Sequence, residues 1–286
     1  MLVNMKEMLR DAQKDKSAIA CINTPNLETI IAVTTAAEEL NVPVIIDHAQ
    51  VHDSIIPIEF IGPYMIEYAK KAKVPVCVHL DHAKDYNFVM RAIRQGFTSV
   101  MYDCSDFPFE ENVRRVKDFV KIAHALDITV EGELGVMTSS GDTDKGSLSG
   151  SGIEKYYTDP VLAGKFIEKT NVDALAVCFG TVHGIYIEKP KLDIERLKQI
   201  KARCGDCPLV MHGGSGVDKK QTQEAISNGI SKVNYYTYMS TAVAPKLVDM
   251  INNSKDRVFF HDISLYATQV MKELCKETIK IFMNKQ

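Results

Sequence analysis

The stretch Val76-Cys77-Val78-His79-Leu80-Asp81-His82 decides the fold, because it joins an apolar strand to a polar end. Residues Val76–Leu80 form a short and mostly apolar run, which is typical of a strand that is buried on both faces. Strands of this kind belong to parallel sheets that are covered by helices. Asp81 and His82 follow the run directly, so the expected strand ends in an ionisable pair.

Similar runs recur along the whole chain and alternate with amphipathic stretches. The predicted strands are Ala18–Ile22, Val42–Asp47, Val76–Leu80, Ser99–Tyr102, Thr129–Glu133, Ala174–Cys178, Leu209–Met211 and Lys232–Asn234. The predicted helices are Leu27–Leu40, Ile58–Lys71, Tyr86–Gln95, Phe109–Leu126, Asp159–Thr170, Ile194–Arg203, Lys219–Asn228 and Thr237–Asn253. Regular alternation implies a parallel sheet, and eight such units predict closure into a (β/α)8 TIM barrel. An open doubly wound sheet usually carries a glycine fingerprint after its first strand, which this sequence lacks.

The remaining organisation is simple. A length of 286 residues suits one barrel, so we expect residues 1–286 to form a single domain. The segment Arg257–Gln286 follows the eighth unit, and we predict one or two extra C-terminal helices there, outside the barrel or on a partner subunit. The longest stretch without periodicity is Leu134–Ser151, and a loop of this length is usually functional or disordered.

Composition excludes several classes of function. The chain is 45% hydrophobic and 25% charged with a formal charge of -3, so no general attraction to nucleic acid or anionic membranes is expected. No apolar run approaches the roughly 20 residues that span a bilayer, and Met1–Glu7 does not resemble a signal peptide. Seven scattered cysteines suit a reducing cytoplasm. Cys204 and Cys207 have C-x-x-C spacing, but without a second pair we interpret them as free thiols.

Three histidines lie where predicted strands end: His82 after an aspartate, and His183 and His212 each before a glycine. A single histidine after a strand is more commonly an ordinary core or loop residue. Three of them at the ends of different strands indicate a metal site, because three imidazoles with an open fourth position hold a catalytic zinc. Asp103, Glu133 and Asn234 also fall at strand ends, which indicates one convergent site.

The other histidines lack this context. His79 lies within its strand, and we interpret it as a packing residue or one that supports the site. No site role is expected for His48, His52, His124 and His261.

Two glycine-rich or polar turns precede helices near the end of the chain. Gly213-Gly214-Ser215-Gly216 leads into the helix at Lys219, and Asn234-Tyr235-Tyr236-Thr237 leads into the helix after the eighth strand. Backbone N–H groups at such turns and at helix N-termini bind phosphate. Barrels frequently use the loops after strands seven and eight for this purpose. The sequence therefore predicts a phosphate site beside the histidines.

Together these motifs resemble the class II (metal-dependent) fructose-bisphosphate/tagatose-bisphosphate aldolase family. The matching segments occur in the family's order over nearly the whole chain: Val74–His82, Gly96–Asp103, Val130–Gly135, Val172–Gly184, Leu209–Gly216 and Lys232–Asn234. The resemblance implies a zinc-dependent lyase that splits a ketose bisphosphate, such as fructose or tagatose 1,6-bisphosphate, into dihydroxyacetone phosphate and an aldehyde, and catalyses the reverse condensation. It also implies a homodimer or homotetramer.

The resemblance assigns a role to each matching residue. The zinc ligands are His82, His183 and His212, with Asp103 and Glu133 as acidic groups that orient the metal or bind it in a second position. Asp81 exchanges a proton with the C4 hydroxyl, and Asn234 lies beside the reacting carbon. The substrate-binding residues are Asn23, Gly184, Gly213, Gly214, Ser215, Asn234, Tyr235, Tyr236 and Thr237. One Zn²⁺ is implied, and a monovalent cation near the phosphate is a further candidate.

The chemistry is consistent with these roles without reference to the family. Cleavage of a carbon–carbon bond beside a ketone leaves an enediolate, and a dication next to the carbonyl stabilises that charge, so no lysine Schiff base is required. A carboxylate such as Asp81 takes the proton from the hydroxyl that becomes the aldehyde. Backbone amides in two loops anchor the phosphate and fix the reacting end.

The sequence departs from the family in the loop after the fifth strand. The family commonly has Gly-Gly-x-Glu-Asp there, whereas this chain has Thr138–Asp142, with Gly141 in place of the glutamate. That glutamate is a candidate base at C3, so either Asp142 or Asp144 replaces it or the proton is handled differently. Of these, Asp142 matches the aspartate of the motif and is the catalytic candidate.

Further departures from the family, taken together, indicate an intact dihydroxyacetone phosphate half and an altered aldehyde half. Ala49 replaces a serine near the distal phosphate, Cys104 replaces a glycine, and Tyr236 and Tyr238 replace small or acidic residues. Arg257 does match a basic position that reaches the distal phosphate, across a dimer interface. We therefore hypothesise an aldehyde partner other than glyceraldehyde 3-phosphate.

Two alternatives remain at this stage. A non-catalytic relative that binds sugar phosphate as a sensor or scaffold would explain the missing glutamate, but not the intact Asp81 and histidines. A metal-dependent barrel hydrolase usually needs a different ligand set with an early His-x-His pair. The sequence does not separate fructose-type from tagatose-type substrates, and cobalt, iron or manganese would also suit the imidazoles.

Overall fold

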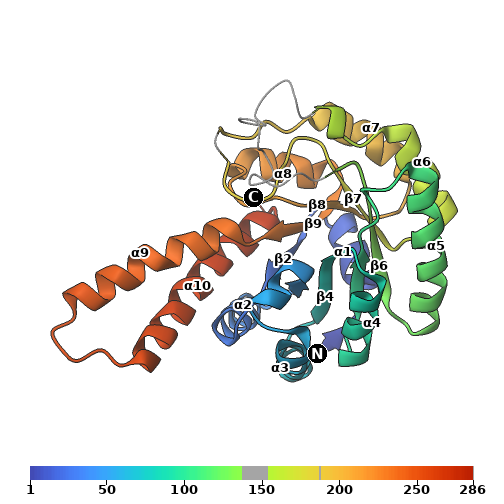
Figure 1. Cartoon of the computed structure of the whole chain (residues 1–286). Helices are drawn as coiled ribbons and strands as arrows, with labels where there is room; N and C mark the ends of the chain where they lie inside the picture. The colour runs from blue at the N-terminus through green and yellow to red at the C-terminus, as the bar shows by residue number, and fades with distance from the viewer. Residues whose placement is uncertain (137–153, 187, 286) are drawn as a thin grey trace.

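The structure is a computed structural model that describes residues 1–136, 154–186 and 188–285. Its centre is a closed parallel barrel of eight strands within these residues, in the order β4-β3-β2-β9-β8-β7-β6-β5 with β5 pairing back to β4 (Figure 1). The strands are β2 (Ile19–Asn23), β3 (Val44–Ala49), β4 (Val76–Ala83), β5 (Ser99–Tyr102), β6 (Thr129–Leu134), β7 (Ala174–Val177), β8 (Leu209–Met211) and β9 (Ile230–Tyr235). The predicted TIM barrel is confirmed.

Helices form the outer ring of the barrel. They are α2 (Leu27–Leu40), α3 (Ile58–Lys71), α4 (Tyr86–Gln95), α5 (Phe109–Ala125), α6 (Pro160–Thr170), α7 (Ile194–Cys204) and α8 (Lys219–Ser227), with 3₁₀ turns η1 (Gln50–Ser54) and η2 (Glu154–Tyr156). Local signals set their bounds: Asn26 accepts a hydrogen bond from the Thr29 N–H and caps α2, and Gly96 ends α4 at φ +92°.

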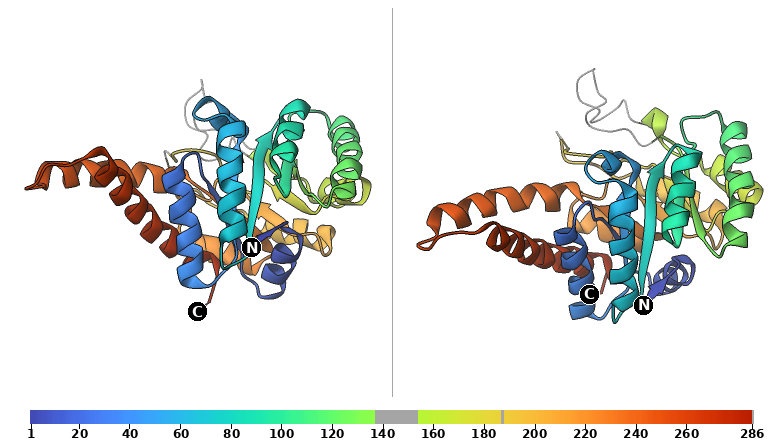
Figure 2. Two further views of the ribbon diagram at one scale, coloured as in Figure 1. Left: turned by 90° about the horizontal axis from the view of Figure 1, so that it is seen from below. Right: turned by 60° about the horizontal axis from the view of Figure 1, so that its bottom comes forward.

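The first residues form two elements that the sequence did not predict, β1 (Leu2–Val3) and α1 (Lys6–Lys14). Strand β1 pairs with the start of β4. Helix α1 buries Met8 and Leu9 against side chains from the inside of the barrel, including Ile45 and Val210. It therefore closes the amino-terminal end of the barrel, below the strands in Figure 2. The functional cavity is left at the opposite, carboxyl-terminal end.

Strand β4 runs further than predicted. It continues to Ala83, so Asp81 and His82 belong to its last residues rather than to the following loop. Its pairing with β5 shifts register between Leu80 and Ala83, and His82 has φ +45°, in the left-handed region. An irregularity of this kind changes the direction of a side chain at the rim of a barrel. Here it turns His82 toward the other histidines.

The C-terminal segment forms a helical hairpin. Helices α9 (Thr237–Asn253) and α10 (Phe260–Phe282) extend away from the barrel and return, and the second half of α10 packs along α2 (Figures 1 and 2). The single helix α10 confirms the extra C-terminal helix. Its buried residues Met271, Cys275, Ile279 and Phe282 attach it to the barrel. In the described part of the chain, every helix is too short or too polar to cross a bilayer.

Candidate metal centre and active site

The carboxyl ends of the strands surround a cavity of about 690 Å³. Most of the sequence-predicted site residues line it: Asn23, Asp81, His82, Asp103, His183, Gly184, Gly213, Ser215, Asn234, Tyr235, Tyr236 and Thr237. Each side of the cavity comes from a different strand or strand–helix loop. The barrel thus brings together residues that are more than 200 positions apart in sequence.

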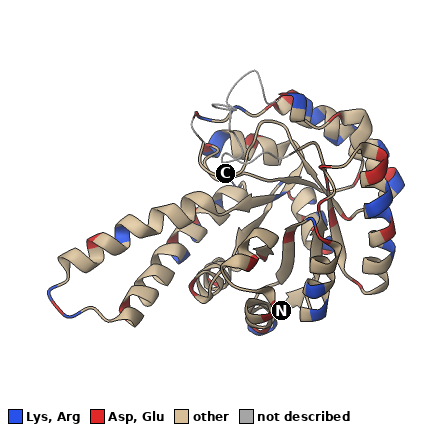
Figure 3. Ribbon diagram, viewed as in Figure 1, with Lys and Arg blue, Asp and Glu red and all other residues tan. Residues whose placement is uncertain are grey.

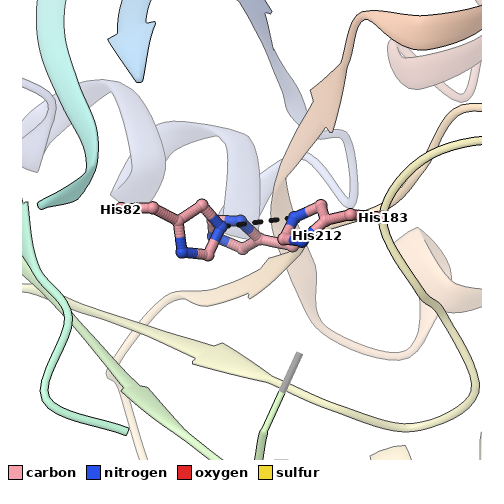
Figure 4. Close-up of side chains that lie close together, drawn as sticks. All are labelled: His82, His183 and His212. Carbon is pink, nitrogen blue, oxygen red and sulfur yellow. Dashed lines mark hydrogen bonds between the residues drawn. The ribbon is translucent and has the colours of Figure 1, made fainter. Parts of the chain in front are cut away.

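Three histidines lie close together (Figure 4): His82 and His183 line the cavity, and His212 is fully buried beside them. His82 Nε2 lies 3.2 Å from His183 Nε2, and the ring centre of His82 lies 4.5 Å from that of His212. One ring nitrogen from each of the three lies within 4.8 Å of the others. Nitrogen ligands that converge from three strand ends are the donor set that zinc prefers, so the residues fit the implied ion.

Carboxylates hold two of the rings in place. His82 Nδ1 is 3.1 Å from Asp103 Oδ2, and His212 Nε2 is 2.7 Å from Glu131 Oε1. Metal-binding histidines usually engage a carboxylate through the nitrogen that does not face the metal. This pattern leaves His82 Nε2 and His212 Nδ1 available as ligands.

Asp103 and Glu133 lie on the far side of His82. Together with His82 they form a second group whose candidate ligand atoms are within 4.8 Å of one another. Glu133 Oε2 is 3.9 Å from His82 Nδ1. The geometry allows these carboxylates either to orient His82 or to take an ion in a second position.

Carboxylates dominate the electrostatics around His82. Burial lowers the pKa of His82, but Asp81, Asp103 and Glu133 outweigh it and raise that pKa to about 10. Burial together with the charges of His82 and His212 keeps the pKa of His183 well below its usual value. A field that favours positive charge on His82 this strongly also favours a bound cation.

Asp81 stands beside the histidines and is almost completely buried. Burial raises its pKa, but the positive charges of His82, His212 and Lys232 together lower it well below its usual range. Asn234 Nδ2 donates to Asp81 Oδ1 at 3.1 Å. The carboxylate is therefore ionised and fixed in direction, as a proton acceptor in the cavity should be.

Sequence reasoning missed a buried ion pair under this site. Glu131 and Lys232 are both fully buried, with Lys232 Nζ 2.9 Å from Glu131 Oε2. The available signal was their position, since each is a charged residue in the middle of a strand whose residues are almost all buried. Charged residues are almost never fully buried unless they are paired.

The two predicted phosphate loops are tied to each other. Tyr236 N–H donates to Ser215 Oγ at 2.9 Å, and Gly214 N–H donates to the Asn234 carbonyl oxygen at 3.1 Å. Gly213 has φ +64°, and a side chain there would collide with the Val182 backbone. Gly214 does not line the cavity. Its hydrogen bond to Asn234 instead holds the two loops together.

Arg257 is a predicted site residue that does not line the cavity, and His52 is among the lining residues that were not expected there. Arg257 lies beyond the end of α9, which begins at the cavity with Thr237 and spans 17 residues, or about 25 Å. Asp142 lies outside the described residues, as do Gly141 and Asp144. His52, for which no role was expected, lines the cavity from η1, with its ring centre 5.3 Å from that of Tyr236. Nothing in its sequence context distinguishes it.

Comparison with known proteins decides the family. Residues 3–286 match the family model described as fructose-bisphosphate aldolase class-II. The chain belongs to this family. This class II aldolase is 38% identical to the fructose-bisphosphate aldolase of Staphylococcus aureus, over 98% of this chain and 97% of that protein.

Solved structures agree with the family. The YdjI aldolase from Escherichia coli K12 superposes on this class II aldolase with a TM-score of 0.86 and 34% identity, covering 99% of this chain and 97% of that one. The fructose-bisphosphate aldolase of Campylobacter jejuni has a TM-score of 0.82 over 100% of this chain and 97% of that one. At 22% identity, the second comparison supports the shared fold alone.

Proposed function

We propose that this aldolase binds one Zn²⁺ through His82, His183 and His212 and cleaves a ketose bisphosphate, such as fructose or tagatose 1,6-bisphosphate. The products are dihydroxyacetone phosphate and an aldehyde, and the reverse condensation uses the same groups. The observation that carries the proposal is the meeting of three imidazoles beside an ionised, buried carboxylate in one cavity.

The protein's own groups divide the work of the reaction. A dication held by His82, His183 and His212 would supply Lewis-acid stabilisation of negative charge at the substrate carbonyl. Asp81 takes the proton of the C4 hydroxyl during cleavage and returns it during condensation. Asn234 holds Asp81 by its 3.1 Å hydrogen bond and faces the same cavity, beside the expected position of the reacting carbon.

Binding of the phosphate fixes the substrate against these groups. Gly184, Gly213 and Ser215 contribute one wall of the cavity, and Tyr235, Tyr236 and Thr237 contribute the adjacent wall at the start of α9. The N–H groups at the beginning of a helix favour an anion. We infer that the dihydroxyacetone phosphate half binds here, so remote binding energy orients the reacting end. A monovalent cation beside this phosphate remains part of the proposal.

The aldehyde half of the cavity supports a substrate preference. Ala49 offers no hydroxyl, and the nearby His52 ring also lines the cavity, with its edge against the Tyr236 ring that borders the dihydroxyacetone phosphate wall. We therefore expect an aldehyde other than glyceraldehyde 3-phosphate to be preferred. In a condensation panel with dihydroxyacetone phosphate and aldehydes of varied length and charge, glyceraldehyde 3-phosphate should not be the best acceptor. A clear lead of glyceraldehyde 3-phosphate over every other aldehyde would contradict this.

The first test is release of triose phosphate from fructose and tagatose 1,6-bisphosphates, with and without a chelator. We expect release that the chelator suppresses and that added Zn²⁺ restores, because the histidines hold the ion on which the reaction depends. The ratio of the two rates ranks the C4 epimers. Chelator-resistant release from a metal-free sample would rule out the proposed role of the ion.

The alternative function is a sensor or scaffold that binds sugar phosphate without cleaving it. Its support is the replacement of the loop glutamate by Gly141. Isothermal titration with fructose 1,6-bisphosphate, followed by product analysis of the same sample, separates the two. Stoichiometric binding with no triose phosphate after prolonged incubation would favour the sensor.

We also propose that the enzyme is a homodimer, or a homotetramer built from two such dimers, through the projecting arm (residues 244–266). The charges of the arm are scattered along it (Figure 3), and between them it exposes Val248, Phe259, Phe260 and Leu265. A second exposed apolar stripe, formed by Phe60, Tyr64 and Tyr68 on α3, lies on the same molecule. Large unpaired apolar surfaces mark protein interfaces, and an arm held by a second copy would carry Arg257 to the partner's cavity.

Subunit complementation tests this assignment of Arg257. Arg257→Ala and Asp81→Asn should each be poorly active alone. In a hybrid dimer, one cavity combines the intact Asp81 of one chain with the intact Arg257 of the other. Co-expression with two different tags should therefore give roughly a quarter of the wild-type activity, because half of the dimers are hybrids with one intact site each. Activity no higher than the average of the parents would show that Arg257 does not act across an interface.

We also propose that the enzyme is cytoplasmic. All seven cysteines are free thiols, and six of them are buried. Free thiols persist in a reducing compartment.

A further inference from the structure

Lys232 is a fully buried lysine at the floor of the active site. It lies on β9, two residues before Asn234, so both side chains project from the same face of the strand. Its ammonium nitrogen contacts two groups: Glu131 Oε2 at 2.9 Å and Asn234 Oδ1 at 2.7 Å. Burial lowers the pKa of Lys232, but Cys21, Glu131 and Asp81 raise it above its usual value, so the group is cationic.

An ammonium can only donate hydrogen bonds, and this determines the orientation of the Asn234 amide. A side-chain amide has an oxygen end and a nitrogen end of nearly the same shape, and in isolation it can adopt either orientation. Contact with Lys232 requires the oxygen end, which leaves the N–H₂ end pointing away. That end donates to Asp81 Oδ1 at 3.1 Å and lies 3.4 Å from His212 Nδ1.

We propose that Lys232 is a positioning residue of the aldolase reaction, which acts by locking the Asn234 amide with its N–H₂ group toward Asp81 and the reacting centre. The inference rests on the proposed roles of Asp81 and Asn234. Without Lys232, the amide oxygen would lose its buried donor, and Asp81 alone would hold the amide. The amide could then tilt, and its hydrogen bond would no longer fix the direction of the Asp81 carboxylate.

Glu131 makes the buried lysine tolerable and links it to the histidines. One of its oxygens faces Lys232 and the other is 2.7 Å from His212 Nε2. The Glu131 carboxylate thus contacts the candidate metal ligand His212 directly. Through Lys232 it also supports the amide of Asn234. Removal of Lys232 alone would leave Glu131 as a buried unpaired charge, which is strongly destabilising.

The test therefore uses a charge-balanced variant, Glu131→Gln with Lys232→Met. The amide that replaces the Glu131 carboxylate can still accept a hydrogen bond from His212, and the two substitutions remove opposite charges. This double substitution is introduced both into the wild-type protein and into the Asn234→Ala variant. Each protein is assayed for kcat, KM, zinc per chain and thermal midpoint with the better of fructose and tagatose 1,6-bisphosphate.

In the wild-type background we expect kcat to fall about 10- to 100-fold, the scale of a misplaced catalytic group, with KM nearly unchanged and zinc retained. In the Asn234→Ala background the same pair should change kcat little, because the amide through which Lys232 acts is already gone. An equal fold-loss in both backgrounds, or a loss that simply follows zinc content, would overturn the proposal.

A second variant tests the same idea without disturbing the ion pair. Asn234→Asp keeps an acceptor for Lys232 but presents no N–H to Asp81, so it should lose about as much kcat as Asn234→Ala. Near-normal turnover would show that the N–H₂ group is not needed, and would also overturn the proposal. Failure of the wild-type enzyme to cleave either bisphosphate would contradict the proposed function. That result is distinct from the variant results, which test Lys232.

Discussion

Asp81→Asn should reduce cleavage of the ketose bisphosphate by about 10²- to 10⁴-fold, the usual contribution of a general acid–base group. The substitution preserves shape and still accepts the hydrogen bond from Asn234, so the cavity should stay intact. What is lost is the carboxylate that takes the C4 proton. The measurements are kcat and KM together with zinc per chain, which should remain at the wild-type value.

The control for Asp81→Asn is Asp106→Asn. Asp106 is an exposed carboxylate that pairs with Lys84 on the loop side of the cavity, so its loss should change kcat little. Turnover of Asp81→Asn within a few-fold of wild type, with zinc bound, would remove Asp81 from the mechanism.

His212→Ala should weaken zinc binding by more than about 100-fold, since loss of an outer-shell partner alone commonly costs 10- to 100-fold. His212 is fully buried and provides one of the three converging ring nitrogens. The substitution leaves two imidazole ligands and frees Glu131 from its hydrogen bond. Zinc per chain after dialysis against a competing chelator is the measurement, and activity should fall in parallel.

His124→Gln is the matched control for the zinc measurement. His124 bonds to Asp173 at 2.8 Å on the outside of the barrel and belongs to neither candidate metal group in the described residues. It should retain the wild-type zinc content. A His212→Ala protein that still held one zinc per chain would disprove the three-histidine assignment.

Much of the architecture follows from local patterns. Buried parallel strands give nearly continuous apolar runs, so the eight barrel strands could be located from sequence. Because their carboxyl ends meet on one face, the three histidines and Asp103, Glu133 and Asn234 could be expected together before any coordinates were known. The irregularity that turns His82 inward could not be expected, since it arises from the register of β4 against β5.

The features that the sequence left out depend on tertiary contacts. Helix α1 is short and has few apolar residues. Its stability comes from the contacts that these residues make with the end of the barrel that the helix covers. His52 reaches the cavity only because η1 folds back after β3. Glu131 and Lys232 look out of place in separate strands until the closed barrel pairs them at 2.9 Å. Arg257 matched a substrate-binding position, yet the arm carries it away from its own cavity.

The most direct test of the account is a zinc titration of metal-free enzyme in which triose phosphate release and bound zinc are measured on the same samples. We predict that activity rises in proportion to bound zinc and reaches its plateau at one ion per chain, because a single set of three histidines holds the ion beside Asp81. Full activity without metal, or a fully loaded protein that binds the ketose bisphosphates and releases no triose phosphate, would contradict the account.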